Sequence, residues 1–248
     1  MTEKSSDERP DDRFVLENLN RIEERIAAAC ASAGRKREEI TLLAVTKTVP
    51  PERINAAIEA GVRQIGENRV QEYLGKRDAL QLDGVDVHLI GHLQTNKVKQ
   101  IVGKVSMIES IDSLRLAEAV SDTSIRQKNA GLLPSGCTDV LVEVNIGGEE
   151  AKSGVAPEEL EKLLYSLADL PGIRVRGLMT VPPILTKPED QRRVFSRMYK
   201  LFIDIRGKNI DNIRMDMLSM GMSSDYEQAI LEGSTLVRIG SALFGRRL

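Results

Sequence analysis

Short apolar runs alternate with amphipathic stretches along almost the whole chain. The first stretch is helical, because Leu19, Ile22 and Ile26 recur at the spacing of one helix face and Gly34 ends the pattern. From Ile40 onward, each short apolar run is followed by a helical pattern. The sequence therefore predicts strands that alternate with helices, which is typical of a parallel sheet.

Eight such strand-then-helix units are predicted. The strands are expected over residues 41–45, 62–65, 87–90, 105–108, 140–144, 173–178, 213–218 and 236–239. Eight units in roughly 210 residues are the content of an α/β fold of the (β/α)8 TIM-barrel type, here with an extra N-terminal helix. A doubly wound open sheet is the alternative, but it usually has fewer strands and often carries a GxGxxG turn, which is absent here. We expect a single barrel domain over residues 13–248 and a disordered or frayed lead over residues 1–12.

Composition narrows the function classes. Hydrophobic residues make up 41% of the 248 residues, and 35 Lys and Arg against 37 Asp and Glu give a formal net charge of −2. This balance argues against nucleic acid as the main partner, since phosphate backbones are bound by concentrated positive charge. No apolar run has the length of a membrane span, and the N-terminus has no apolar leader. Cys30 and Cys137 are far apart and form no CxxC pattern, which favours a reducing compartment. We therefore expect a cytoplasmic protein, and the lack of an apolar span predicts no membrane contact.

Lys47 is the first candidate for chemistry. Barrels place their sites at the carboxyl ends of the strands, and Lys47 follows a strand that is apolar throughout. Its amine therefore begins close to the barrel interior. Partial desolvation lowers the pKa of a lysine, and the neutral amine is the form that attacks an aldehyde. A surface lysine in a loop is the ordinary alternative.

Small residues follow the last two strands. Gly221 and Ser223 precede a helix expected to begin at Ser224, because residues 224–227 have the Ser-x-x-Glu spacing of a capping box. Gly240 and Ser241 precede the last helix in the same way. Two adjacent helix N-termini are the usual place for a phosphate in barrels, although ordinary helix capping would use the same residues.

Charged residues near these strand ends have further interpretations. Arg238, one residue inside the end of the last strand, is expected to be a buried cation there or half of a structural ion pair. His88 and His92 are four residues apart, but on a strand and its following loop that spacing does not bring both to one metal ion. We expect no metal site.

Five segments, each at a predicted strand end, carry a resemblance. They are Ala44-Val45-Thr46-Lys47-Thr48, Gly66-Glu67-Asn68-Arg69-Val70-Gln71-Glu72, His88-Leu89-Ile90-Gly91-His92-Leu93-Gln94-Thr95-Asn96-Lys97, Ser219-Met220-Gly221-Met222-Ser223-Ser224-Asp225 and Arg238-Ile239-Gly240. Together they resemble the pyridoxal phosphate homeostasis protein family, which consists of single-barrel relatives of the alanine racemase N-terminal domain. The resemblance covers about residues 19–246. It implies a fold-type III barrel without the C-terminal β domain of racemases.

The same resemblance implies a cofactor site. Lys47 would hold pyridoxal 5′-phosphate as a Schiff base. Ser223, with the backbone N–H groups of Gly240 and Ser241, would bind the phosphate, and Arg238 would face the pyridine nitrogen. The other cofactor-binding positions that it implies shape the phosphate turn or line the wall near the ring: Asn68, His92, Asn145, Met179, Ser219, Gly221 and Met222.

The resemblance also bears on turnover. An arginine opposite the pyridine nitrogen disfavours its protonation and makes the ring a weaker electron sink. Racemases of this group pair the lysine with a tyrosine from an additional C-terminal β domain of the partner subunit. The sequence ends at Leu248, directly after the barrel, and its tyrosines (Tyr73, Tyr165, Tyr199 and Tyr226) fall in predicted helices. We therefore expect a binding protein without a second base.

The expected function is that of a carrier or regulator of pyridoxal phosphate in vitamin B6 homeostasis. We expect a monomer whose partners are the cofactor itself and enzymes that lack it. Lys152, in the loop after the fifth strand, is a further candidate aldehyde acceptor, with an exposed loop lysine as the alternative. Two other functions stay open: a pyridoxal phosphate-dependent amino-acid racemase, and a barrel enzyme that acts on a phosphorylated sugar or a cofactor precursor without aldehyde chemistry.

Overall fold

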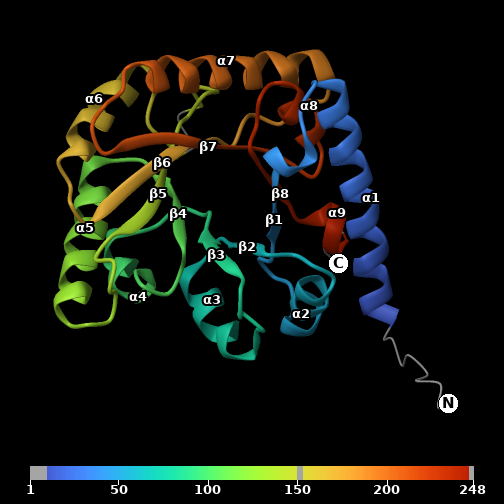
Figure 1. Cartoon of the computed structure of the whole chain (residues 1–248), viewed down its shortest axis with the longest axis horizontal. Coiled ribbons are helices and arrows are strands. Elements are labelled where there is room, and N and C mark those ends of the chain that lie inside the picture. Colours follow the sequence, from blue (N-terminus) through green and yellow to red (C-terminus); the bar gives the residue numbers. More distant parts are fainter. Residues whose placement is uncertain (1–9, 150–152, 246–248) are drawn as a thin grey trace.

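Eight parallel strands form a closed barrel (Figure 1). The structure, a computed structural model, describes residues 10–149 and 153–245. The strands are β1 (Thr41–Val45), β2 (Gln64–Glu67), β3 (Asp86–Leu89), β4 (Met107–Ile111), β5 (Thr138–Glu143), β6 (Ile173–Met179), β7 (Ile213–Met222) and β8 (Leu236–Ile239). Each strand pairs with its sequence neighbours, and β8 closes the barrel on β1 with Leu43 opposite Arg238. The predicted barrel is confirmed, and the open sheet is excluded.

Helices surround the barrel in the part of the chain that the structure describes. They are α1 (Pro10–Ser32), α2 (Pro51–Glu59), α3 (Val70–Lys76), α4 (Val98–Ile101), α5 (Leu114–Asn129), α6 (Pro157–Ala168), α7 (Pro188–Gly207), α8 (Tyr226–Leu231) and α9 (Ser241–Phe244), with single 3₁₀ turns over Arg37–Glu39, Arg77–Ala79 and Thr95–Lys97. The extra helix α1 runs along the outside of the barrel and contacts α2, α8 and α9 (Figure 1). None of the helices within the described ranges is long and apolar enough to cross a membrane.

Strand β1 shows how the apolar runs build two layers of core. Leu42 and Ala44 belong to the large cluster between the barrel and its helices. Leu43 and Val45 alternate with them and pack with Leu236 of β8 inside the barrel. Because successive side chains of a strand point to opposite faces, a strand buried on both faces is a nearly continuous apolar run.

Several strands extend beyond the apolar runs that predicted them. β4 continues through Glu109 and Ser110, and β7 continues through Ser219 to Met222. Polar side chains inside the barrel interrupt the apolar pattern, so the pattern ends before the strand does. At the other end of the chain, α1 begins at Pro10, within the stretch expected to be a lead. Residues 1–9 lie outside the described part.

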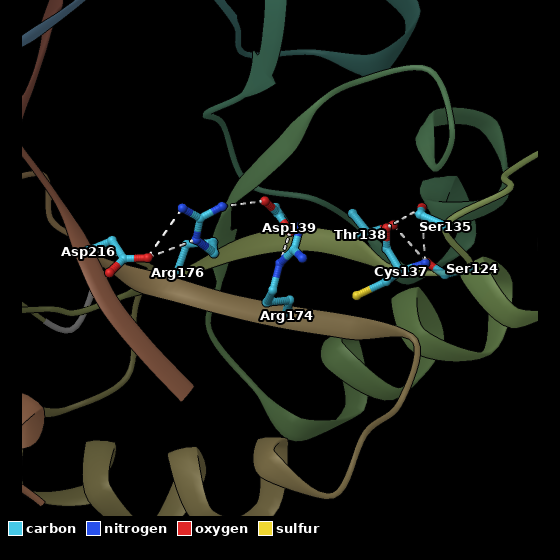
Figure 2. Close-up of polar contacts among 8 residues, drawn as sticks. All are labelled: Ser124, Ser135, Cys137, Thr138, Asp139, Arg174, Arg176 and Asp216. Atoms are coloured by element: carbon cyan, nitrogen blue, oxygen red, sulfur yellow. Dashed lines mark hydrogen bonds and ion pairs between the residues drawn. The ribbon is translucent and has the colours of Figure 1, made fainter. Parts of the chain in front are cut away.

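Four charged residues join β5, β6 and β7 near the amino ends of these strands (Figure 2). The carboxylate of Asp139 accepts hydrogen bonds from Arg174 Nε at 2.7 Å and from Arg176 Nη1 at 2.8 Å. Arg176 Nε donates to Asp216 at 3.2 Å. This network lies at the opposite end of the strands from Lys47. Residues at that amino-terminal face of a barrel contribute to its stability and not to its site.

Candidate functional site

Lys47 lies in the turn after β1, two residues past the end of the strand. The preceding residues Leu43 and Val45 face the barrel interior, so the turn starts at the barrel mouth. The side chain of Lys47 is half-buried. The adjacent strand β8 brings Arg238 and Gly240 to the same end of the barrel, and a Cβ on Gly240 would lie 3.3 Å from Val45 Cβ. Residues far apart in sequence thus meet at one corner of the barrel mouth.

A chain of hydrogen bonds crosses the barrel interior. Arg238 Nη1 donates to Ser219 Oγ at 2.5 Å, and Ser219 Oγ donates to Glu109 Oε2 at 2.6 Å. His88 Nδ1 lies 2.6 Å from the other carboxylate oxygen of Glu109. Arg238 Nη2 also donates to the carbonyl of Thr180 at 2.7 Å. Since β4 and β7 are not neighbours in the sheet, the bond between Glu109 and Ser219 spans the barrel.

The two charges of this chain stabilise each other. Burial lowers the pKa of Arg238, and the carboxylates of Glu109, Glu143 and Asp225 oppose that effect. Burial raises the pKa of Glu109, but the hydrogen bond from His88 and the charges of His88 and Arg238 outweigh it, so the net pKa of Glu109 lies below its usual range. Arg238 is therefore a fixed cation held by buried partners. Arg238 is buried, as predicted, and its link to Glu109 through Ser219 also gives it the structural role that was the alternative.

Ser223 joins the turns that follow β7 and β8. Its Oγ accepts hydrogen bonds from the backbone N–H of Gly240 at 3.1 Å and of Ala242 at 3.2 Å. Ser241 lies between these two residues and is exposed. The oxygen of Ser223 thus occupies these two N–H groups, and its hydroxyl hydrogen is the donor that this corner can offer to a phosphate oxygen.

The turn after β7 depends on Gly221. Its φ is +94°, and a Cβ there would lie 2.6 Å from Ala229 Cβ. The predicted capping box over residues 224–227 is wrong, because α8 begins at Tyr226 with Asp225 at its N-cap and no side-chain cap bond. Asp225 instead accepts a hydrogen bond from the N–H of Met222 at 2.6 Å, which fixes the turn before the helix.

The other predicted site residues lie at the ends of β2, β3, β5 and β6. Asn68 directly follows β2, and its buried Oδ1 has no hydrogen-bond partner in the described part of the chain. His92 is exposed, and its Nδ1 lies 3.4 Å from Asp112. Asn145 Nδ2 donates to the carbonyl of Glu149 at 2.8 Å. Met179 is fully buried among apolar side chains of the interior.

Glu143 is a titratable group that sequence reasoning missed. It ends β5 two residues after Leu141, which faces the barrel interior, and it is 7% exposed. Burial raises its pKa to about 6, assisted by Asp112 and opposed by Arg238 and His92. The signal in the sequence is a single acidic residue inside the apolar run 140–144. The same signal marks Glu109 between Ile108 and Ile111.

The turn after β1 contains an uncommon backbone conformation. Thr48 has a φ of +61°, which a β-branched residue adopts at a cost of about 1 to 3 kcal/mol. The N–H of Val49 donates to the carbonyl of Thr46 at 3.0 Å and closes the turn around Lys47. The hydroxyl of Thr46 donates to the carboxylate of Glu67 on β2.

The four tyrosines lie on helices. Tyr73 on α3 is buried and donates its hydroxyl to the carbonyl of Lys104 at 2.8 Å. Tyr226 on α8 is also buried, and Tyr165 and Tyr199 are exposed on α6 and α7. No group of His, Cys, Asp and Glu suited to a metal ion occurs among the described residues. Lys152 lies outside them.

Comparisons with known proteins identify relatives over nearly the whole chain. A sequence profile described as "Alanine racemase, N-terminal domain" matches residues 18–247. A protein of Aquifex aeolicus named "Pyridoxal phosphate homeostasis protein" is 46% identical over 233 residues, which are 94% of this chain and 98% of the relative. A protein of the same name from Escherichia coli strain K12 is 41% identical over 237 residues, which are 94% of this chain and 97% of the relative.

Solved structures resemble the barrel as well. The structure of PipY from Synechococcus elongatus with pyridoxal phosphate bound has a TM-score of 0.78 and 29% identity, and it covers 93% of this chain and 100% of that one. An alanine racemase from Clostridium difficile has a TM-score of 0.71 at 17% identity, over 95% of this chain and 57% of the racemase. At that identity the likeness to the racemase concerns the fold alone.

Proposed function

We propose, from the premise that this chain belongs to the alanine racemase N-terminal domain family and within it to the pyridoxal phosphate homeostasis proteins, that it binds pyridoxal 5′-phosphate and acts in its homeostasis. The relatives of that name match over almost their full length. The proposed role is to hold and release the cofactor.

One observation carries the proposal. Lys47, Arg238 and the paired turns at Ser223 and Gly240 meet at the carboxyl ends of β1, β7 and β8. The site thereby combines a lysine amine, a buried cation and a set of backbone donors within one corner of the barrel. Few ligands need all three, and pyridoxal phosphate is one of them.

Each part of the site has a distinct task. When bound, pyridoxal phosphate supplies an aldehyde that condenses reversibly with an amine and releases water. Lys47 supplies that amine. Ser223 Oγ accepts the N–H groups of Gly240 and Ala242, so its hydroxyl hydrogen is the donor that it offers to the phosphate, with the N–H of Ser241 beside it. Asn68 Oδ1 is a buried acceptor without a hydrogen-bond partner among the described residues. Arg238 presents a positive charge, which disfavours protonation of a ring nitrogen nearby.

A racemase is the second candidate function, and Glu143 is the observation that favours it. A carboxyl group whose pKa is about 6 is suited to acid and base catalysis near neutral pH. Against it, all four tyrosines lie on helices, and the likeness to a racemase at 17% identity supports the fold alone. We therefore favour binding and release over turnover.

Borohydride reduction followed by peptide mapping tests the proposed function. Protein incubated with pyridoxal phosphate is expected to retain a pyridoxyl group on Lys47 after reduction, and Lys47→Ala is expected to lose it. A wild-type chain that retains none contradicts the proposal. Chiral chromatography after incubation with single L-amino acids separates the two candidates, because sustained D-enantiomer formation that requires Lys47 would favour the racemase.

We further propose a location, an oligomeric state and partners for the protein. It is a cytoplasmic monomer, and the enzymes that receive pyridoxal phosphate from it are ones that lack this cofactor. The unpaired state of Cys30 and Cys137 supports a reducing compartment. We also treat the barrel with its N-terminal helix as one domain over residues 13–248.

A further inference from the structure

The backbone next to Lys47 is held in a left-handed conformation. Thr48 has a φ of +61°, and β-branched residues rarely adopt this conformation because the side chain crowds the backbone. Such a residue keeps its conformation only where surrounding contacts fix it. The contacts that fix Thr48 therefore also determine the position of Lys47.

Two charged side chains of α3 bind the peptide groups on either side of Lys47. The N–H of Thr48 donates a hydrogen bond to the carboxylate of Glu72. Lys76 Nζ donates to the carbonyl of Thr46 at 2.8 Å. Glu72 and Lys76 also form an ion pair with each other at 3.1 Å. Glu72 and Lys76, which are one helical turn apart on α3, thus bind both of the peptide groups that flank Lys47.

The pair formed by Glu72 and Lys76 is also attached to the barrel. Lys76 Nζ lies 2.7 Å from Glu67 Oε1, and the side chain of Glu67 is fully buried at the end of β2. Burial raises the pKa of Glu72. The hydrogen bond from the N–H of Thr48 and the charge and hydrogen bond of Lys76 lower this pKa by more than burial raises it, so the net pKa lies below the usual range. Glu72 is therefore an anion at neutral pH and an effective acceptor for the Thr48 N–H.

We propose that Glu72 and Lys76 are positioning residues for Lys47. They hold the turn over residues 46–49 in its strained form, so that the lysine amine stays at the barrel mouth where an aldehyde can reach it. This inference rests on the proposed function of Lys47. A merely structural alternative is that the pair fastens α3 to the barrel. The hydrogen bond from Tyr73 to Lys104 fastens α3 independently, so the two roles can be separated.

The first experiment uses formaldehyde with cyanoborohydride on the full chain without added cofactor. Peptide mapping follows the methylation rate of each lysine from about pH 6 to about pH 10, a range that lies below the ordinary lysine pKa of about 10.4. In Glu72→Gln we expect the rate at Lys47, relative to the other lysines of the same chain, to fall about threefold or more, because the amine is no longer held where the aldehyde reaches it.

Matched variants separate positioning from stability. Tyr73→Phe removes the other attachment of α3 and is expected to leave the Lys47 profile as in the wild type. In Glu72→Gln with Thr48→Gly, glycine adopts a positive φ without strain, and we expect most of the lost rate to return. Circular dichroism on heating shows whether each variant is folded. If Glu72→Gln does not fold, Lys76→Met is judged by the same criteria.

The outcomes are decisive. A folded Glu72→Gln or Lys76→Met with the wild-type relative rate at Lys47 overturns the inference, and so does a double variant without recovery. A parallel borohydride trap with pyridoxal phosphate tests the proposed function separately. If the wild-type chain traps none of it, the proposed function fails, while the formaldehyde profile still decides whether Glu72 and Lys76 position Lys47.

Discussion

The guanidinium of Arg238 lies 2.5 Å from the hydroxyl oxygen of Ser219, deep inside the barrel. Ser219 passes the interaction on to Glu109, so a cation on β8 and an anion on β4 are connected through one hydroxyl group. A buried charge without a partner is costly, and each member of this chain therefore depends on the others. The charge of Arg238 is therefore maintained by Glu109 on β4, a strand that is not a neighbour of β8.

Glu109→Gln is expected to lower the free energy of unfolding by about 3 kcal/mol, because it leaves Arg238 as a buried cation without its anion. Urea denaturation measures this loss. Glu118→Gln, at an exposed position of α5, removes the same charge from the surface and is expected to change stability by less than about 0.5 kcal/mol. Equal stabilities for the two variants would contradict the role given to Glu109.

Ser223→Ala is expected to weaken binding of pyridoxal phosphate by about tenfold, since one hydroxyl donor to a charged group is lost. Pyridoxal, which lacks the phosphate, serves as the control ligand. Its affinity is expected to be the same for the wild type and the variant. Absorbance titration with both ligands gives the two ratios, and an equal loss for both would show that Ser223 does not act on the phosphate.

Glu143 predicts a pH dependence of stability. Its pKa of about 6 in the folded chain lies above the ordinary value of 4.5, so its favourable contribution is complete below pH 4.5 and is lost as the pH rises through 6. The difference corresponds to about 2 kcal/mol. Glu143→Gln is therefore expected to be more stable than the wild type at pH 8 by up to about 2 kcal/mol.

At pH 4 the advantage of Glu143→Gln is expected to disappear, because the wild-type carboxyl group is then protonated in both the folded and the unfolded chain. Urea denaturation at both pH values checks this difference. A stability difference that does not change with pH would show that Glu143 titrates as an ordinary surface carboxylate.

Asp139→Asn is expected to destabilise the barrel by about 2 kcal/mol without changing the affinity for pyridoxal phosphate. Asp139 pairs with Arg174 and Arg176 at the amino ends of the strands (Figure 2), and its side chain is 14% exposed. Thermal unfolding and absorbance titration measure the two quantities. A loss of affinity in a folded variant would show that the two ends of the barrel are coupled.

The sequence was informative wherever a strand is apolar on both faces. The run before Lys47 predicted the strand and the place of this lysine just past its end. Glu109 and Glu143 were missed because a polar side chain inside a barrel is satisfied by strands distant in sequence, such as the strand that carries Ser219. No local pattern encodes such a partner.

The turns were predicted in place but not in detail. The Ser-x-x-Glu spacing at residues 224–227 gave the wrong first residue of α8, because the N–H of Met222 binds the carboxylate of Asp225. The roles of Asn68, His92, Asn145 and Met179 came from resemblance and stay predictions. The contribution of Glu72 and Lys76 depends on the packing of α3 against the turn over residues 46–49 and could not be read from spacing.

The pairing of β8 with β1 has a consequence for synthesis on the ribosome. Lys47 is translated before the backbone groups beside Gly240, which follow it by 193 positions in the sequence (240 − 47). Until the final strand docks, the nascent chain carries the amine without the groups proposed to grip the anionic end of the ligand. A chain in which β8 has not yet paired with β1 is therefore expected to lack the proposed grip on the phosphate.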